Sequence, residues 1–325
     1  MASNSTEKIK RILLQTESVT KPELSKATGL TTATCGYILN ELLKKGEIIE
    51  EKFRMSSGGR PAKAYRYNSS KHQFLCLYAL FESGIQLIRF RVFDALGNVI
   101  AKGENKENRI NKTTLLKRIQ KILAKHPQVG IISIGIQGGI CHGTVEFCDF
   151  PGLNGINLEA ELFNAFQIPV YVENDMNSIA LGYSLKNSNE KNLSILFIPK
   201  GNPPAGGFLV DGKILRGSSN LAGELSYFPF SFKKQEQSKI FSEIGTAFPY
   251  ILQVLLATIV FLDPAVIVFT GGFTDELSVQ DINEKLRRNL HRPQLPRLIF
   301  KANLQEEYFS GLYKMAAEIF INQKT

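Results

Sequence analysis

Residues near the start of the chain that could bind a polyanion are grouped within 31–40. The group comprises Thr31, Thr32, Thr34, Tyr37 and Asn40, with the small residues Ala33 and Gly36 between them. Threonine hydroxyls can bond phosphates or base edges, and small residues permit close approach of a backbone. No Arg or Gln lies in the group, so no base preference follows. The residue types predict contact with nucleic acid.

A second group follows in the stretch RMSSGGRPA, from Arg54 to Ala62. Gly59 removes a side chain, and Pro61 holds the chain extended. Arg60 is then free to enter a narrow minor groove. Gly-Arg-Pro occurs by chance in many loops, but here it lies one hairpin after the first group. That placement favours a basic wing tip.

Local signals predict the helices that position the first group. Ile9, Ile12 and Leu13 have helical spacing within a first helix over residues 5–15. Thr20, with Pro22 and Glu23 behind it, is typical of an N-cap, and the second helix should end at Gly29. A third helix should start at Thr31 or Thr32 and end at Gly46, with its apolar residues Ile38, Leu39, Leu42 and Leu43 facing inward.

Two alternating segments, 47–53 and 64–68, flank the basic tip as strands. Three helices followed by such a hairpin predict a winged helix-turn-helix whose third helix enters the major groove. The helices alone would also fit a small bundle that binds protein. The hairpin favours the DNA-binding interpretation.

The charge supports a polyanion partner. Residues 1–72 hold 13 Lys and Arg against 7 Asp and Glu, so most of the net charge of +9 lies on the first fifth of the chain. The first ten residues contain no apolar run, so we expect no signal peptide. Residues 251–270 are apolar but are interrupted at Asp263-Pro264, which favours a buried helix and a buried strand over a membrane span.

Cysteine usage predicts reduced thiols and a cytoplasmic protein. The four cysteines form no CxxC pair, and their spacing is not that of a disulfide framework. Cys141, His142 and Cys148 lie close in sequence, but three scattered donors favour ordinary packing over a metal site.

The composition changes after the polar segment 68–72, so we predict a head over residues 1–70 and a body over 71–325. In the body, strands and helices alternate, which predicts an α/β fold. The expected strands are 74–81, 85–93, 99–100, 129–136, 170–172 and 266–269, and the expected helices are 115–125 and 158–166. A helix over 306–321 would either close the body or join a partner.

Three stretches of the body carry a resemblance to a known family. They are FPGLNGINLEAELFNAFQIPVYVENDMNSIALGYS (150–184), DGKILRGSSNLAGELSYFP (211–229) and DPAVIVFTGGF (263–273). They resemble the ROK family of repressors, open reading frames and sugar kinases. The head, with GGRPA in its wing, is similar to the family's xylose and N-acetylglucosamine repressors. The resemblance implies an actin-like, ribonuclease-H-like, two-lobed sugar-kinase body with the sugar in the cleft.

The resemblance also implies roles for individual residues. Asp175 stands where the kinases have the general base that acts on the sugar hydroxyl. Asn174 and Glu224 would bond other hydroxyls, and Gly138 would let the backbone approach the sugar ring. Asp149 stands about where the family has a further hydroxyl-binding asparagine. Each of these polar residues could instead be a solvated loop residue.

Three departures from the family pattern argue against catalysis. Residues 82–86 (ESGIQ) replace the first phosphate loop, and residues 201–207 (GNPPAGG) replace the second with two prolines that lack N–H donors. Tyr227 occupies the position of a zinc-binding histidine, and no cysteine follows it. We therefore expect no cofactor and no metal. Tyr227 would contact a ligand or belong to the core.

Together these features predict a non-enzymatic repressor in the cytoplasm. Its partners would be operator DNA, a sugar or sugar-phosphate effector and a second copy in a homodimer or higher oligomer, with no membrane contact. Two alternatives stay open: an active sugar kinase with a DNA-binding head, and a scaffold that binds protein.

Overall fold

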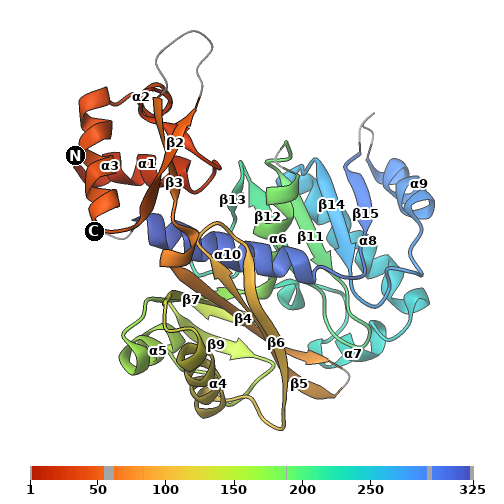
Figure 1. The fold of residues 1–325 in the computed structure, drawn as a ribbon. Coiled ribbons are helices and arrows are strands. Elements are labelled where there is room, and N and C mark those ends of the chain that lie inside the picture. Colours follow the sequence, from red (N-terminus) through yellow and green to blue (C-terminus); the bar gives the residue numbers. More distant parts are fainter. Residues whose placement is uncertain (1, 55–61, 83, 188, 291–294, 323–325) are drawn as a thin grey trace.

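The computed structural model describes the 325-residue chain except for residues 1, 55–61, 83, 188, 291–294 and 323–325. A small head lies against one end of a larger body (Figure 1). The described part of the head contains three helices and a sheet with strand order β1-β3-β2. Its elements are α1 (Ala2–Leu13), β1 (Val19–Thr20), α2 (Lys21–Thr28), α3 (Thr32–Lys44), β2 (Ile48–Arg54) and β3 (Ala62–Tyr67).

The caps that the sequence predicts define the helices of the head. Thr20 and Glu23 form a reciprocal capping box at the start of α2, and Gly29 ends that helix with φ +71°. Thr31 caps α3, because its hydroxyl accepts a hydrogen bond from the Thr34 amide at 3.1 Å. The predicted helix-turn-helix is confirmed. Strand β1 was not predicted, since two residues carry no periodic signal.

The body contains two five-stranded sheets. The first has the order β10-β7-β4-β5-β6 and consists of β4 (Gln73–Glu82), β5 (Ile85–Asp94), β6 (Val99–Glu107), β7 (Val129–Ile136) and β10 (Val170–Asn174). The second has the order β13-β12-β11-β14-β15 and consists of β11 (Leu193–Phe197), β12 (Ala205–Val210), β13 (Lys213–Ile214), β14 (Val266–Thr270) and β15 (Arg297–Phe300). A small hairpin, β8 (Gly138–Cys141) and β9 (Thr144–Cys148), extends from the first sheet.

The body's helices form three layers around these sheets. The longer ones are α4 (Lys112–Lys125), α5 (Leu158–Phe166), α6 (Asp175–Lys186), α8 (Ile244–Leu262), α9 (Val279–Asn289) and α10 (Gln305–Asn322), and α7 (Gln237–Ile240) is one turn. Helices α4 and α5 share a core with the first sheet, and α8 and α9 share one with the second. Helices α6 and α10 lie between the two sheets (Figure 1). The predicted two-lobed α/β body is confirmed.

The central helices α6 and α10 cross at the closest distance that two backbones allow. A Cβ atom on Gly182 would overlap the Glu307 carbonyl oxygen, and one on Gly311 would overlap the Ser178 carbonyl oxygen. Each glycine therefore lies against the backbone of the other helix. Because a packed core does not deform continuously, the two helices form one rigid unit.

Segment 68–72, expected to be a polar linker, is an ordered connection. Its centre is a short 3₁₀ turn, η1 (Ser69–Lys71), and Asn68 donates hydrogen bonds to the Glu47 and Gly46 carbonyls. The His72 ring lies 4.7 Å from the Phe320 ring of α10. One buried cluster runs from Leu39 in the head to Phe320 in the body. The head and body therefore share a core at the predicted boundary.

The C-terminal helix closes the body and also contacts the head. Arg11 of α1 forms a two-pronged ion pair with Glu318 of α10, at 2.5 and 2.8 Å. The Tyr313 hydroxyl donates to the Ala95 carbonyl at 2.9 Å. The sequence left open whether this segment closes the body or joins a partner. The structure places it within the chain's own core.

Residues 251–270 form a helix and a strand, as predicted, but the helix is not fully buried. Strand β14 is buried throughout. On α8, Val260 and Phe261 are 65% and 81% exposed, so the expectation of a buried helix is wrong for its outer face. Of the helices in the described ranges, only α8 is long and apolar enough to cross a membrane by length and composition, a property that core helices share.

The close crossing predicts a large effect of one methyl group. Gly311→Ala should lower the free energy of unfolding by about 1–3 kcal/mol or more, because the backbone of α6 cannot move aside. Thermal and urea unfolding of the full chain measure this. Gly245→Ala on α8 is the matched control, because it has no heavy atom within 4 Å of its would-be Cβ and should be neutral or slightly stabilising. Equal stability of the two variants would contradict the rigid crossing.

Candidate functional site

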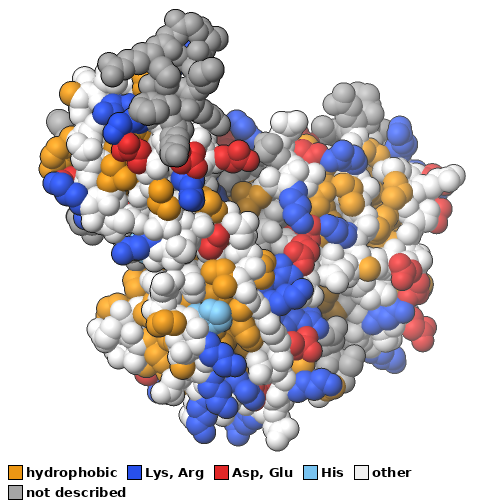
Figure 2. Space-filling view, in the orientation of Figure 1, with side chains coloured by type: hydrophobic (Ala, Val, Ile, Leu, Met, Phe, Trp, Pro, Cys, Tyr) orange, Lys and Arg blue, Asp and Glu red, His pale blue; other side chains and the backbone are white. Residues whose placement is uncertain are grey.

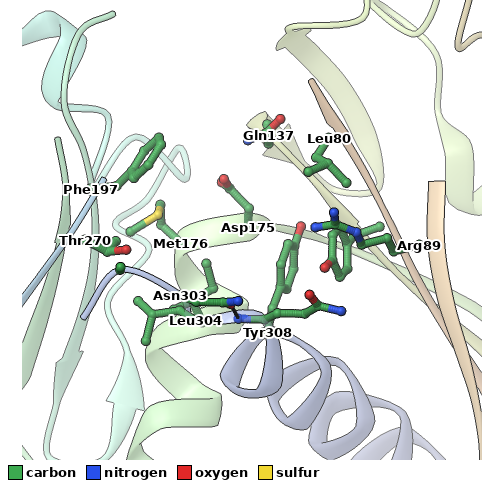
Figure 3. A pocket seen from close by; sticks show the side chains of 14 residues that line it. Leu80, Arg89, Gln137, Asp175, Met176, Phe197, Thr270, Asn303, Leu304 and Tyr308 are labelled. Atoms are coloured by element: carbon green, nitrogen blue, oxygen red, sulfur yellow. Dashed lines mark hydrogen bonds between the residues drawn. The ribbon is translucent and has the colours of Figure 1, made fainter. Parts of the chain in front are cut away.

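A cavity of about 250 Å³ lies between the two sheets, where α6 and α10 begin. Residues from both lobes line it, including Arg89, Gln137, Asp175, Phe197, Thr270 and Tyr308 (Figure 3). The Asp175 carboxylate points into the open space, and the Tyr308 ring reaches upward from the start of α10 beside it. The cavity lies where the sequence resemblance expects the sugar cleft.

Asp175 is the first residue of α6 and is 8% exposed. Desolvation by burial, with a smaller contribution from the negative charges of Glu224 and Asp149, raises the pKa of its carboxyl to about 7. A hydrogen bond from the Met176 amide acts in the opposite direction. A carboxyl with a pKa near neutrality can accept or release a proton at physiological pH.

Asn174 and Gly138 adjoin the cavity residues Asp175 and Gln137 in sequence but are not among the described residues that line the cavity. The Asn174 side chain caps α6 by accepting from the Asn177 amide at 3.1 Å, and it donates to the Gly138 carbonyl at 2.9 Å. A Cβ on Gly138 would overlap the Phe147 carbonyl oxygen of the paired strand β9. Both residues therefore have structural roles, and their contact with a ligand stays a prediction.

Asp149 and Glu224 are not among the described residues that line the cavity, although the charge of each raises the pKa of Asp175. Asp149 follows β9, and its amide donates to the Gln137 carbonyl at 3.3 Å. Glu224 follows Gly223, whose carbonyl accepts from the Gly206 amide at 2.8 Å. Asp149 is exposed and Glu224 is half-buried, and desolvation raises the pKa of both carboxyls.

Tyr227 lies at the edge of this region and is 54% exposed. Its ring lies 6.2 Å from the Phe147 ring, and the Lys234 ammonium lies 4.2 Å from its centroid. The exposure excludes the alternative in which Tyr227 is a core residue. Within the described residues, no three His, Cys, Asp or Glu side chains are close enough to hold a metal ion.

Of the residues that line the cavity, only Asp175 was among the predicted effector-binding residues, and those missed include Tyr78, Arg89, Gln137 and Tyr308. The Tyr78 and Tyr308 rings stack at 4.2 Å with an interplanar angle of 14°. Tyr308 fits because Gly135 has no side chain, since a Cβ there would overlap the ring. Tyr308 enters from the last helix of the chain, so no local motif connects it with Asp175.

Three amides at or beside the two replaced phosphate loops are bonded within the chain. The Phe81 amide, just before the first loop, donates to the Gln137 side chain at 3.1 Å. In the second loop, the Gly201 amide donates to the Phe241 carbonyl and the Gly206 amide to the Gly223 carbonyl, both at 2.8 Å. These donors are not free to bind a phosphate.

A second polar contact joins the two lobes beside the cleft. Arg216, after β13, donates to the Glu173 carboxylate at 2.6 and 3.0 Å and to the Tyr171 hydroxyl at 3.2 Å. Asn220 donates to the Ile140 carbonyl at 2.8 Å across the same gap. These bonds hold the loop before Glu224 against the first lobe.

On the head, the predicted α3 surface is largely accessible. Thr31, Thr32, Ala33, Tyr37 and Asn40 are exposed, with Tyr37 at 69%. Thr34 is half-buried, and its hydroxyl lies 2.8 Å from that of Thr31. The expectation that Gly36 belongs to this surface is wrong, because it is buried against Lys21.

The predicted wing-tip residues Gly59, Arg60 and Pro61 lie outside the described residues. On the face of the molecule drawn in Figure 2, Lys and Arg side chains lie on both the head and the body, with Asp and Glu side chains among them. The basic surface is therefore not confined to the head.

Comparison with known proteins agrees with this geometry. Residues 78–238 match the model of the ROK family. The xylose repressor of Caldicellulosiruptor bescii is 26% identical over 69% of this chain and 58% of its own length, and that of Bacillus subtilis is 23% identical over 68% and 59%. The matched region thus spans less than two thirds of these relatives.

Solved structures share the fold. A ROK family transcriptional regulator, described as a homologue of the Escherichia coli MLC protein, superposes with a TM-score of 0.74 at 18% identity and covers 99% of both chains. The ROK hexokinase of Thermus thermophilus superposes with a TM-score of 0.59 at 18% identity, over 76% of this chain and 99% of its own. The predicted fold, and a ROK family domain over residues 78–238, are confirmed.

The pKa of Asp175 predicts a specific pH dependence of stability. A carboxyl whose pKa is raised on folding binds more protons in the native state, so stability falls as the pH rises from the unfolded to the folded pKa. Asp175→Asn should therefore raise the melting temperature relative to wild type at about pH 8 and much less at about pH 5. Asp211→Asn, at an exposed turn residue, is the control. An equal gain at both pH values would contradict the buried-carboxyl assignment.

Proposed function

We propose that this chain, which carries a ROK family domain, is a DNA-binding transcriptional repressor of carbohydrate-related genes. Its body would sense a sugar or sugar derivative without phosphorylating it. The exposed α3 face of a winged helix-turn-helix supports contact with operator DNA. The relatives named as xylose repressors support carbohydrate control and a cytoplasmic location.

The observation that carries this proposal is the path of α10. The first turn of this helix lines the cavity through Tyr308, and its last turns hold the head through Glu318 and Phe320. Figure 1 shows α10 running from between the two sheets to the base of the head. One rigid element therefore contacts both the ligand cleft and the DNA-binding domain.

The mechanism follows from this connection. A ligand that closes the lobes would shift the α6–α10 unit, and with it the head. In a homodimer on a two-fold-related operator, the spacing of the two heads would change. Coupling of about 1–3 kcal/mol, or about 5–150-fold in affinity, is typical of such transitions.

The absence of catalysis is part of the proposal. Phosphoryl transfer depends on positioning and on neutralising phosphate charge. The amides of Phe81, Gly201 and Gly206, at or beside the two loops, are bonded within the chain and are not available to phosphate. The opposing candidate is an active sugar kinase, which the near-neutral pKa of Asp175 favours.

DNA binding is tested by footprinting on the region upstream of the protein's own gene. We expect salt-sensitive, site-specific protection, because phosphate contacts release counterions. Tyr37→Ala or Asn40→Ala should weaken binding by about 1–3 kcal/mol. Phe163→Ala, at a half-exposed aromatic residue of α5 in the body, should leave it unchanged. No protection would instead favour a scaffold that binds protein.

The kinase alternative is tested with labelled ATP and a panel of hexoses. We expect no sugar phosphate above the background of a reaction without protein. Turnover that Asp175→Asn abolishes would show that the protein is a kinase and would overturn the non-catalytic assignment.

A further inference from the structure

The charged side chains of helix α4 are all basic. Between Glu107 and Glu146 the chain contains six Lys and Arg but no Asp or Glu, and five of the six lie on α4. The apolar residues of this helix, among them Leu115 and Ile119, are buried in the core that it shares with the first sheet. Solvent-exposed surfaces normally intersperse both signs of charge. The outer face of α4 therefore has a local excess of positive charge.

Three lysines form a line along this face. Lys117, Lys121 and Lys125 are spaced four residues apart, so they lie on one side of the helix, and all three are exposed. The other two cations of α4 are paired with glutamates of α5 and β6, but none of these three forms an ion pair with a described residue. Figure 2 shows Lys and Arg side chains gathered on the part of the body where Figure 1 places α4. The chain leaves these three ammonium groups unbalanced.

The line of lysines leads toward the head. The end of α4 contacts the connection between head and body, because the Gln73 amide donates to the Gln128 carbonyl at 3.1 Å and their side chains bond at 3.3 Å. Lys71 lies in this connection and is exposed. Lys45, the C-cap of α3 on the head, is also exposed. Exposed lysines thus continue from the end of α3 across the connection to α4, and we call these five residues the basic track.

The spacing of the α4 charges fits a phosphate backbone. A rise of about 1.5 Å per residue places Lys117 and Lys125 about 12 Å apart along the helix. Over that length one DNA strand carries about three or four phosphates, because they follow one another at about 3.4 Å of axis. The head at the other end of the track is the DNA-binding element of the proposed function. Duplex DNA is therefore the polyanion that both ends of the track can share.

We propose that the α4 face binds the phosphate backbone of duplex DNA flanking the operator through Lys117, Lys121 and Lys125, with Lys71 and Lys45 contacting phosphates nearer the head. This inference rests on the proposed repressor function and adds to it a second, sequence-independent DNA contact. A lysine ammonium is a flexible point charge, and phosphate contacts carry no sequence information, so this contact adds affinity without specificity. It requires DNA that extends beyond the recognition sequence and follows the side of the body.

The salt dependence of binding to two DNA fragments tests the proposal. The short fragment ends at the edges of the recognition sequence, which base substitutions define, and the long one extends about two helical turns further on each side. Affinity for the full chain is measured by fluorescence anisotropy between about 50 and 200 mM salt. Each phosphate contact contributes about −0.9 to the slope of log affinity against log salt, so the slope should be steeper on the long fragment by about 3 for each body that contacts DNA.

Removal of the three α4 charges locates the contact. The triple variant Lys117→Gln, Lys121→Gln, Lys125→Gln should abolish the difference in slope between the two fragments. It should weaken binding to the long fragment by about tenfold or more at about 100 mM salt and leave binding to the short fragment unchanged. The three side chains are exposed, so the melting temperature should match that of the wild type.

A matched control removes the same charge from the other lobe. Lys191, Lys213 and Lys239 are exposed and form no ion pair with a described residue. The triple variant Lys191→Gln, Lys213→Gln, Lys239→Gln should retain the steeper slope on the long fragment, because these lysines lie outside the basic track. The control separates a contact at α4 from the effect of net charge.

The outcomes separate this inference from the proposed function. Equal slopes of the wild type on both fragments would overturn the body contact and leave operator binding by the head intact. An α4 variant that behaves like the control, or that weakens both fragments equally, would overturn it in the same way. If the wild type binds neither fragment, the body contact and the repressor function fail together.

Discussion

The crossing of α6 and α10 is the constraint on which the rest of the structure depends. Gly182 and Gly311 bring two backbones into direct contact, which leaves the helices no freedom to slide separately. Asp175 is fixed at one end of this unit, and the head is fixed at the other through Glu318 and Phe320. A packed core responds to a local displacement by shifting as a block. The site and the head are thereby mechanically connected.

The cleft has a stability cost that a binding partner can relieve. Asp175 is desolvated and lies near two further carboxylates, so its ionised form is destabilised in the folded chain. Such arrangements persist where they serve binding or chemistry. In this chain the neighbouring amides are bonded within the protein, and Tyr308 occupies the space that Gly135 leaves open. These contacts support the proposed role in binding without phosphoryl transfer.

Local signals in the sequence predicted much of the fold. Capping residues such as Thr20 and Gly29 determine helix ends through contacts a few residues away, and strand β7 and helix α5 were predicted to the residue. The family motifs predicted Asp175 in the cleft. Tyr308 could not be predicted there, because its position depends on the tertiary packing of the last helix. The exposure of Phe261 and the burial of Gly36 also depend on neighbours distant in sequence.

A ligand can move the head only if it binds the two arrangements of the lobes with different affinity, because equal affinity shifts no population. Contact with one lobe alone would not provide that difference. Gln137 follows β7 of the first sheet and Thr270 ends β14 of the second, while Asp175 begins α6 between them, and all three line the cavity. A ligand that contacts all three can therefore bind two arrangements of the lobes with different affinity. In the proposed repressor, thermodynamic reciprocity then requires that the factor by which the ligand changes DNA affinity equals the factor by which DNA changes ligand affinity.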